Sequence, residues 1–132
     1  MADNKLIAKG TFEVEMKPVT QDKAGDITTG QYSIEKKFAG DLEGTSKVDM
    51  LAIGSDNGSG TYVALEQVNG TLNGKSGSFA LTHIGNRNKT SAELIVTIVP
   101  GCSTGDLEGL EGKMTINIVD KKHLYELEYS FV

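Results

Sequence analysis

The sequence has no tryptophan, two prolines and one cysteine among its 132 residues. A single cysteine, Cys102, cannot form an internal disulfide, which excludes a disulfide-stapled module and favours a reducing compartment. No apolar run approaches the roughly 18 residues of a membrane-spanning helix, and the first residues lack the apolar stretch of a signal peptide. We therefore expect a cytoplasmic protein that has no membrane partner.

Basic residues are also scarce, because 13 Lys and Arg stand against 18 Asp and Glu and give a formal net charge of −5. This excess of acid repels a phosphate backbone, so nucleic acid is not an expected partner. The length suits one domain with a modest core, and we expect residues 1–132 to form a single domain.

Helical periodicity is nearly absent, and alternation takes its place. Apolar residues recur at every second position, which is typical of strands whose side chains point to opposite faces in turn. The alternation predicts about eight strands, centred on residues 11–16, 31–38, 45–54, 61–68, 79–83, 92–98, 114–118 and 124–131. Between the third and fourth strands, Asn57-Gly58 predicts a tight hairpin, because both residues accept positive φ angles.

Eight strands with short connections use up nearly all of the chain. An antiparallel meander hides its strand edges best by closing on itself. The sequence therefore predicts an all-β fold, a closed eight-stranded antiparallel up-and-down barrel. A two-sheet sandwich is the alternative.

A Gly-x-Leu-x-Gly repeat occurs three times, at residues 40–44, 70–74 and 105–109. Each copy follows an even-numbered strand, so all three fall at one end of the barrel. We expect that end to be plugged by the central leucines, Leu42, Leu72 and Leu107. If the barrel has a mouth, it lies at the opposite end, where the segments are polar: residues 17–26, 55–60, 85–89 and 120–122.

Three segments carry a resemblance to a known family. They are Phe-Ala-Gly-Asp-Leu-Glu-Gly at residues 38–44, Val-Asn-Gly-Thr-Leu-Asn-Gly-Lys-Ser-Gly-Ser-Phe at 68–79, with His83 after it, and Val-Pro-Gly at 99–101. The chain resembles, over essentially its whole length, an uncharacterised family of small bacterial proteins whose barrel is similar to that of plant allene oxide cyclase. The resemblance implies an allene-oxide-cyclase-like barrel but no activity, because a shared barrel does not carry chemistry with it.

Two enzyme motifs are matched only in part. Gly-Cys-Ser-Thr-Gly at residues 101–105 has the form Gly-x-Ser-x-Gly, but a hydrolase needs that serine on a strand-to-helix turn, and here a strand follows. Residues 69–76 approach a P-loop, yet asparagine replaces its first glycine and no helix follows.

The two histidines and one cysteine have no zinc spacing. We expect neither a metal nor a cofactor.

Three ionisable residues, Lys36, Glu66 and His83, occupy apolar parities of their strands, so they are expected to point into the barrel. In a functional interpretation His83 moves a proton, Glu66 orients it or acts as base, and Lys36 holds an anionic oxygen. In a structural interpretation the three groups satisfy one another across the lumen. Four tyrosines could line the same space or belong to the core: Tyr32, Tyr62, Tyr125 and Tyr129.

Three functions remain open at this point. The lumen could bind a small, mostly apolar or weakly acidic ligand, or the same lumen could serve a cofactor-free isomerase or cyclase. The third possibility is a structural or interaction protein with a filled barrel. A lumen of roughly 300 Å³ or more that opens to solvent favours the first two.

Some strands break the alternation, because residues 50–53, 63–65 and 94–99 are apolar on both parities. The outward members would form one exposed apolar patch on the barrel wall, which a monomer rarely shows. We therefore expect a homodimer or a higher homo-oligomer built on this patch: Leu51, Ile53, Val63 or Leu65, Ile95 and Val99.

Overall fold

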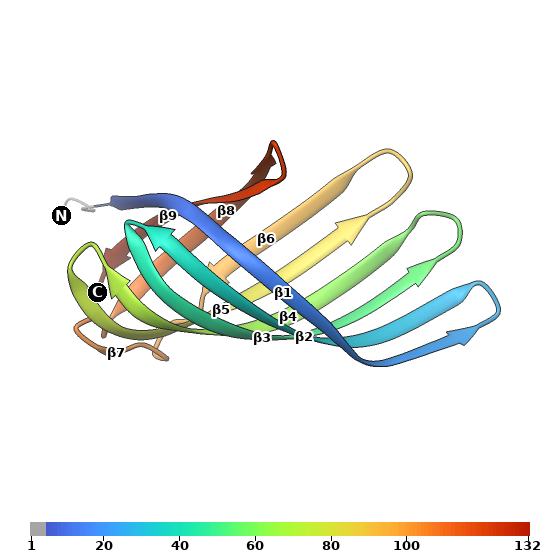
Figure 1. The fold of residues 1–132 in the computed structure, drawn as a ribbon, viewed down its shortest axis with the longest axis horizontal. Coiled ribbons are helices and arrows are strands. Elements are labelled where there is room, and N and C mark those ends of the chain that lie inside the picture. The colour runs from blue at the N-terminus through green and yellow to red at the C-terminus, as the bar shows by residue number, and fades with distance from the viewer. Residues whose placement is uncertain (1–4) are drawn as a thin grey trace.

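The computed structural model describes residues 5–132, and within this range it contains strands and turns but no helix (Figure 1). No helix in residues 5–132 is therefore long and apolar enough to cross a membrane. The strands are β1 (Leu6–Ala24), β2 (Ile27–Gly40), β3 (Leu42–Ser55), β4 (Gly60–Leu72), β5 (Lys75–Arg87), β6 (Ala92–Ile98), β7 (Thr104–Gly105), β8 (Leu110–Val119) and β9 (Lys122–Phe131).

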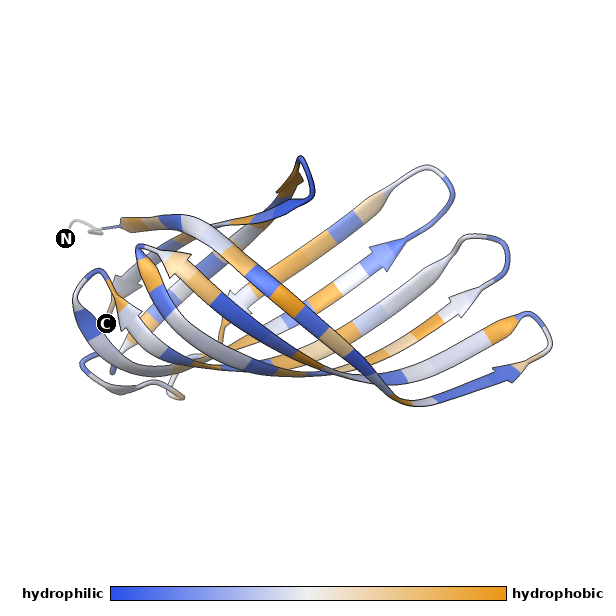
Figure 2. Cartoon of the chain, in the orientation of Figure 1, coloured by the Kyte–Doolittle hydropathy of each residue, from blue (hydrophilic) through white to orange (hydrophobic). Residues whose placement is uncertain are grey.

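The strands form one sheet that closes into a barrel. Their order is β4-β3-β2-β1-β9-β8-β6-β5, and β4 pairs with β5 to complete the circle. Every pairing is antiparallel, and the two-residue β7 adds a short strap on β5. The closed eight-stranded barrel is therefore confirmed, and the sandwich alternative is wrong. Bands of high and low hydropathy alternate along the strands in Figure 2, as a one-sided core requires.

The first strand is much longer than its apolar alternation predicts. The expected polar loop at residues 17–26 is wrong, because β1 continues to Ala24 and only Gly25 and Asp26 form the turn. A bulge at Val19, beside Pro18, shifts the register with β2. Residues 13–24 are exposed, so no buried face imposes the alternation that marks a strand.

The hairpin predicted between the third and fourth strands is confirmed, since β3 ends at Ser55 and β4 begins at Gly60. Only Gly58 takes a positive φ, at 92°. Asn57 instead accepts a hydrogen bond at its side-chain oxygen from the backbone N–H of Ser59, at 2.9 Å. The loop therefore uses the asparagine as a side-chain acceptor rather than for left-handed backbone.

One end of the barrel is closed by the three repeat leucines. Leu42, Leu72 and Leu107 are at most 1% exposed and belong to one core cluster. Four glycines pair with one another across neighbouring strands at this end and let the strands approach closely: Gly44 on β3, Gly70 on β4, Gly77 on β5 and Gly105 on β7. A Cβ added at Gly44 would lie 2.2 Å from the carbonyl oxygen of Asn69. The close approach narrows this end around the leucine plug.

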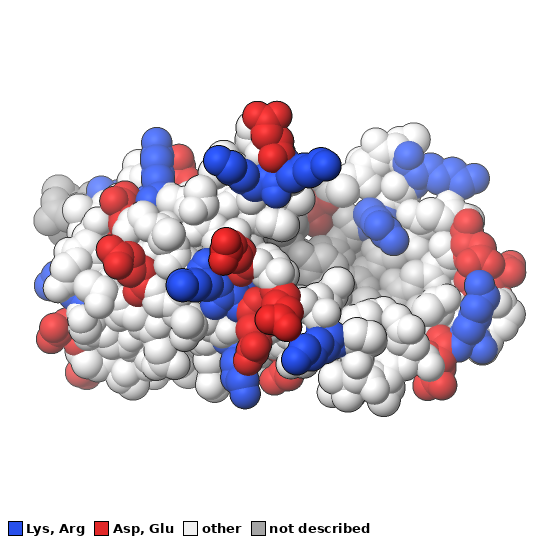
Figure 3. Space-filling model, in the orientation of Figure 1, with Lys and Arg blue, Asp and Glu red and all other residues white. Residues whose placement is uncertain are grey.

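The other end is open. The β1–β2, β3–β4 and β5–β6 turns project together at this end (Figure 1). Among the described strands, β9 pairs with β1 only over residues 6–12, and β8 pairs with β6 only at Val96 and Thr97. Toward the open end, β1 is therefore no longer paired with β9, and β6 is no longer paired with β8, within residues 5–132. Figure 3 shows the molecule hollowed in this half.

Candidate functional site

Four polar side chains meet inside the barrel between two apolar layers. Lys36 lies on β2, Ser46 on β3, Glu66 on β4 and His83 on β5, each at an inward position of its strand. The registers stagger them toward the open end, since Lys36 pairs with Ser46, Glu66 lies one inward position beyond that row and His83 lies two. We call these four residues the Glu66 cluster.

Glu66 is the centre of the cluster and is fully buried. One carboxylate oxygen, Oε1, lies 3.1 Å from Lys36 Nζ and 2.7 Å from His83 Nε2. The other, Oε2, accepts a hydrogen bond from Ser46 Oγ at 2.6 Å. All three predicted ionisable residues therefore come together, and the structure adds Ser46.

Ser46 was not predicted, although a signal for it exists. It shares its parity on β3 with Leu42, Val48 and Met50, so alternation places it inside. Small polar residues are common on both faces of strands and draw less attention than a buried charge.

Burial raises the pKa of Glu66, but the hydrogen bond from His83, the charge of Lys36 and the hydrogen bond from Ser46 outweigh it and hold the pKa below its ordinary 4.5. Glu66 is therefore ionised at neutral pH and engaged at both oxygens. It is committed to its three partners and is not placed to act as a base. Lys36 is similarly committed, because its Nζ also lies 4.7 Å from the centre of the Phe12 ring.

His83 keeps one nitrogen free. An ionised Glu66 requires the proton of a neutral His83 to be on Nε2, which leaves a lone pair on Nδ1. No hydrogen bond to Nδ1 occurs within residues 5–132, where Ser103 Oγ is the sole buried side-chain N or O atom without a partner. Nδ1 is therefore the ring nitrogen left without a hydrogen-bond partner among the described residues, and Glu66 fixes the orientation of the ring.

A cavity of about 550 Å³ occupies the open half of the lumen. Its inner wall carries Met16, Tyr32, Met50 and Tyr62, and its rim includes Arg87, with Asn86, Glu93 and Leu94. Met16 is 54% exposed although it faces inward, so this half is open to solvent. Tyr32 and Met50, which line the cavity, lie in the same cross-strand row as His83, because Met50 pairs with both Tyr32 and Ala64 and Ala64 pairs with His83.

Tyr32 and Tyr62 lie against glycines of the wall. A Cβ added at Gly85 would lie 2.2 Å from the Tyr62 ring, and one at Gly30 would lie 2.5 Å from the Tyr32 hydroxyl. Burial raises the pKa of Tyr62 above 10.0, which keeps its hydroxyl protonated. Both tyrosines therefore line the cavity, as the sequence suggested.

Tyr125 and Tyr129 lie elsewhere. Tyr125 packs at the closed end, where its hydroxyl accepts a hydrogen bond from the N–H of Leu42 at 2.8 Å, and burial raises its pKa. The Tyr129 hydroxyl accepts a hydrogen bond from Asn73 Nδ2 at 2.7 Å. Strand parity places both residues inside, but their positions along β9 assign them to the plug rather than the cavity.

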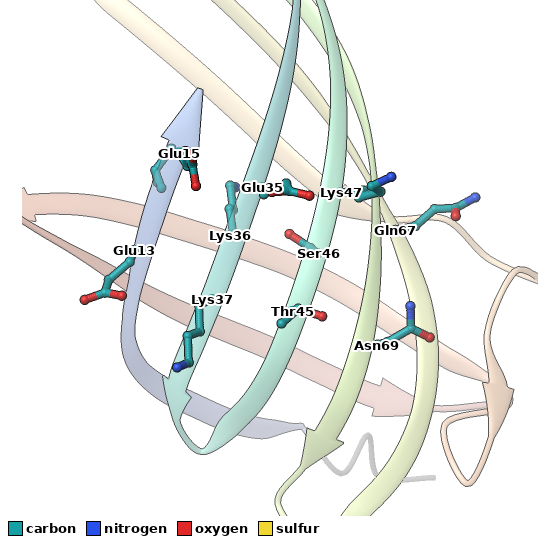
Figure 4. Close-up of a pocket in the computed structure, with 11 residues that line it drawn as sticks. Glu13, Glu15, Glu35, Lys36, Lys37, Thr45, Ser46, Lys47, Gln67 and Asn69 are labelled. Carbon is teal, nitrogen blue, oxygen red and sulfur yellow. The ribbon is translucent and has the colours of Figure 1, made fainter. Parts of the chain in front are cut away.

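A second depression, of about 860 Å³, lies on the outer face of β1 to β4 (Figure 4). Its outward side chains carry both signs of charge in adjacent positions, such as Glu13 beside Lys37 and Glu35 beside Lys47. Lys36 and Ser46 also border this depression, but their functional groups point into the barrel, where they contact Glu66. The depression is a solvated face of alternating charge, and the lumen is the better candidate site.

Comparison with known proteins gives a family. A family model described as "Protein of unknown function (DUF3224)" matches residues 8–129. A crystal structure of a protein with unknown function from the DUF3224 family of Shewanella oneidensis MR-1 is 36% identical and superposes with a TM-score of 0.91. That alignment covers 98% of this chain and 99% of the other. No curated protein matches.

Proposed function

Because the chain belongs to the DUF3224 family of proteins of unknown function, we propose its role from the barrel itself: it binds a small, mostly apolar molecule in the open half of the lumen. The observation that carries the proposal is the cavity of about 550 Å³ directly above the Glu66 cluster. Ligand sites in proteins have volumes of roughly 300–1,000 Å³ and combine apolar walls with a few fixed polar groups.

The walls suit an apolar body. Met16 and Met50 have flexible, polarizable side chains that adapt to irregular shapes, and Tyr32 and Tyr62 offer ring faces. Removing such surfaces from water is the main driving force for a ligand of this kind.

The polar end is His83 Nδ1, the free acceptor of the cluster. A hydroxyl or weakly acidic O–H group that displaced water from the base of the cavity would donate to this lone pair. Met50 lies two strands from His83 in the same row, and its three rotatable bonds allow its side chain to adjust to such a ligand. The ligand class is therefore a small apolar molecule with one weakly acidic or hydroxyl group.

Two measurements test the binding proposal. Native mass spectrometry of the protein as purified looks for a co-purifying small molecule, and the neutral fluorescent probe N-phenyl-1-naphthylamine reports an apolar site. We expect saturable probe binding that is lost in Ala52→Phe, since Ala52 lies on the cavity wall. Leu51→Phe is the matched control, because Leu51 is the adjacent residue on the outer face. Equal probe binding by both variants would refute the lumen as the site.

A second candidate, a cofactor-free isomerase or cyclase, is supported by the Glu66–His83 pair. A carboxylate that holds Nε2–H directs the Nδ1 lone pair of the imidazole toward the lumen, as proton transfer requires. The expected likeness to allene oxide cyclase adds only an analogy of fold. A bound ligand recovered chemically unchanged after long incubation, with no exchange of its C–H protons for deuterium, counts against catalysis.

We also propose a cytoplasmic location. The supporting observation is Cys102, which is free and exposed and would be prone to oxidation in an oxidising compartment.

A further inference from the structure

The outer wall of the barrel is divided into two kinds of surface. Over β1, β2, β8 and β9 the outward residues are largely charged and include cross-strand ion pairs such as Lys5 with Glu128 and Lys9 with Glu126. Figure 3 shows charged side chains of both signs gathered on the face that β1 crosses. Across the middle of β3 to β6, by contrast, the outward residues are aliphatic.

The aliphatic residues form a continuous row. Leu51 pairs with Val63, Val63 with Ile84 and Ile84 with Ile95, so one outward aliphatic side chain comes from each of β3, β4, β5 and β6. Each of the four is 45 to 57% exposed. We call these four residues the apolar row, and Ile53 and Leu65 extend it on either side.

The row and its flanks carry no basic residue. The adjacent outward positions toward the open end are Ile53, Thr61, Asn86 and Glu93, and those toward the closed end are Asp49, Leu65, Thr82 and Thr97. The two charges among them are both acidic, so an anionic lipid surface would be repelled.

The aliphatic side chains supply about two thirds of the apolar surface of a standard interface. Six aliphatic side chains near half exposure present roughly 300 Å² of apolar surface, taking roughly 100 Å² for one that is fully exposed. One side of a standard protein interface buries roughly 800 Å², of which somewhat more than half, roughly 450 Å², is apolar. Threonine methyl groups beside the row supply part of the difference.

The row is also complementary to itself. A two-fold axis parallel to the strands and midway between β4 and β5 sets Leu51 of one copy against Ile95 of the other, and Val63 against Ile84. The same axis sets Asp49 against Thr97, so no carboxylate meets a carboxylate. We propose that the apolar row is the interface of a two-fold homodimer of this chain.

Light scattering coupled to size exclusion, at micromolar concentration, tests the proposal. The wild type is expected at about 28 kDa, twice the chain mass of 14.1 kDa. Ile84→Lys, at the centre of the row, is expected to weaken the dimer on the order of 100-fold and to elute as a monomer. Ile7→Lys is the matched control, since Ile7 is an outward isoleucine of similar exposure on β1, and this variant should stay dimeric.

Circular dichroism verifies that both variants keep the β fold. A folded monomer of Ile84→Lys beside a dimeric Ile7→Lys supports the interface. A monomeric wild type overturns the proposal, as does a folded Ile84→Lys that remains dimeric. An assembly larger than a dimer overturns the two-fold arrangement.

Discussion

Replacing Glu66 and replacing Lys36 should have very different effects, although the two residues form one ion pair. Glu66→Leu leaves Lys36 Nζ in a buried position with the Phe12 ring as its remaining partner, and it also strands Ser46 and His83. Breaking a buried pair in this way costs roughly 3–5 kcal/mol, since the surviving charge is uncompensated.

Lys36→Met leaves Glu66 with two of its three partners. Ser46 Oγ at 2.6 Å and His83 Nε2 at 2.7 Å still donate to the carboxylate, and methionine fills much of the space of the lysine stem. We expect a change within about 1 kcal/mol of wild type, in either direction. The double variant Lys36→Met/Glu66→Leu has neither charge of the buried ion pair, so no lysine charge is left uncompensated. It should therefore be more stable than Glu66→Leu alone by roughly 1–2 kcal/mol.

Urea unfolding at neutral pH, followed by far-ultraviolet circular dichroism, measures all four proteins, since the chain has no tryptophan to report fluorescence. The expected difference between the two partners is wrong if Lys36→Met lowers the free energy of unfolding as much as Glu66→Leu. It also fails if the double variant loses the sum of the two single losses, which would mean that the charges do not interact.

Three further predictions concern other parts of the barrel. The pKa of Glu66 is lowered on folding, so its contribution to stability is present above pH 4.5 and is lost as the pH falls through the folded-state pKa. Urea unfolding between about pH 6 and pH 3 should therefore show a steeper loss of stability for wild type than for Glu66→Gln. Gly44→Ala should destabilise by roughly 3 kcal/mol, because its Cβ meets the Asn69 carbonyl, whereas Gly54→Ala on the same strand has no atom within 3.4 Å and should be nearly neutral in the same assay. Burial raises the pKa of Tyr62 and of Tyr125, so tyrosinate absorbance during alkaline titration should contain a late component that Tyr62→Phe reduces. An unchanged curve would contradict the burial of the Tyr62 ring.

The barrel could be predicted from the sequence because most strands are buried on one side. In β4, Ala64, Glu66 and Val68 alternate with exposed residues, and a period of two assigns each side chain to a face. The same rule failed for β1 beyond Met16, where both faces meet water and no apolar alternation is required.

The candidate site was only partly predictable. Parity placed Lys36, Glu66 and His83 inside, and antiparallel pairing brought them together. Parity carries no information about depth along the barrel, so Tyr125 and Tyr129 were grouped with Tyr32 and Tyr62 although they belong to the opposite end. Depth depends on the stagger between strands, which the structure alone supplies.

The most direct test of the proposed lumen site is methyl NMR of the methionines during titration with N-phenyl-1-naphthylamine. Met16 and Met50 line the cavity, while Met114 is buried in the core of the closed half. Binding in the lumen predicts saturable shifts of the Met16 and Met50 methyl signals with one dissociation constant and an unmoved Met114 signal. Stationary Met16 and Met50 signals at probe saturation, or an equal response from Met114, would contradict it.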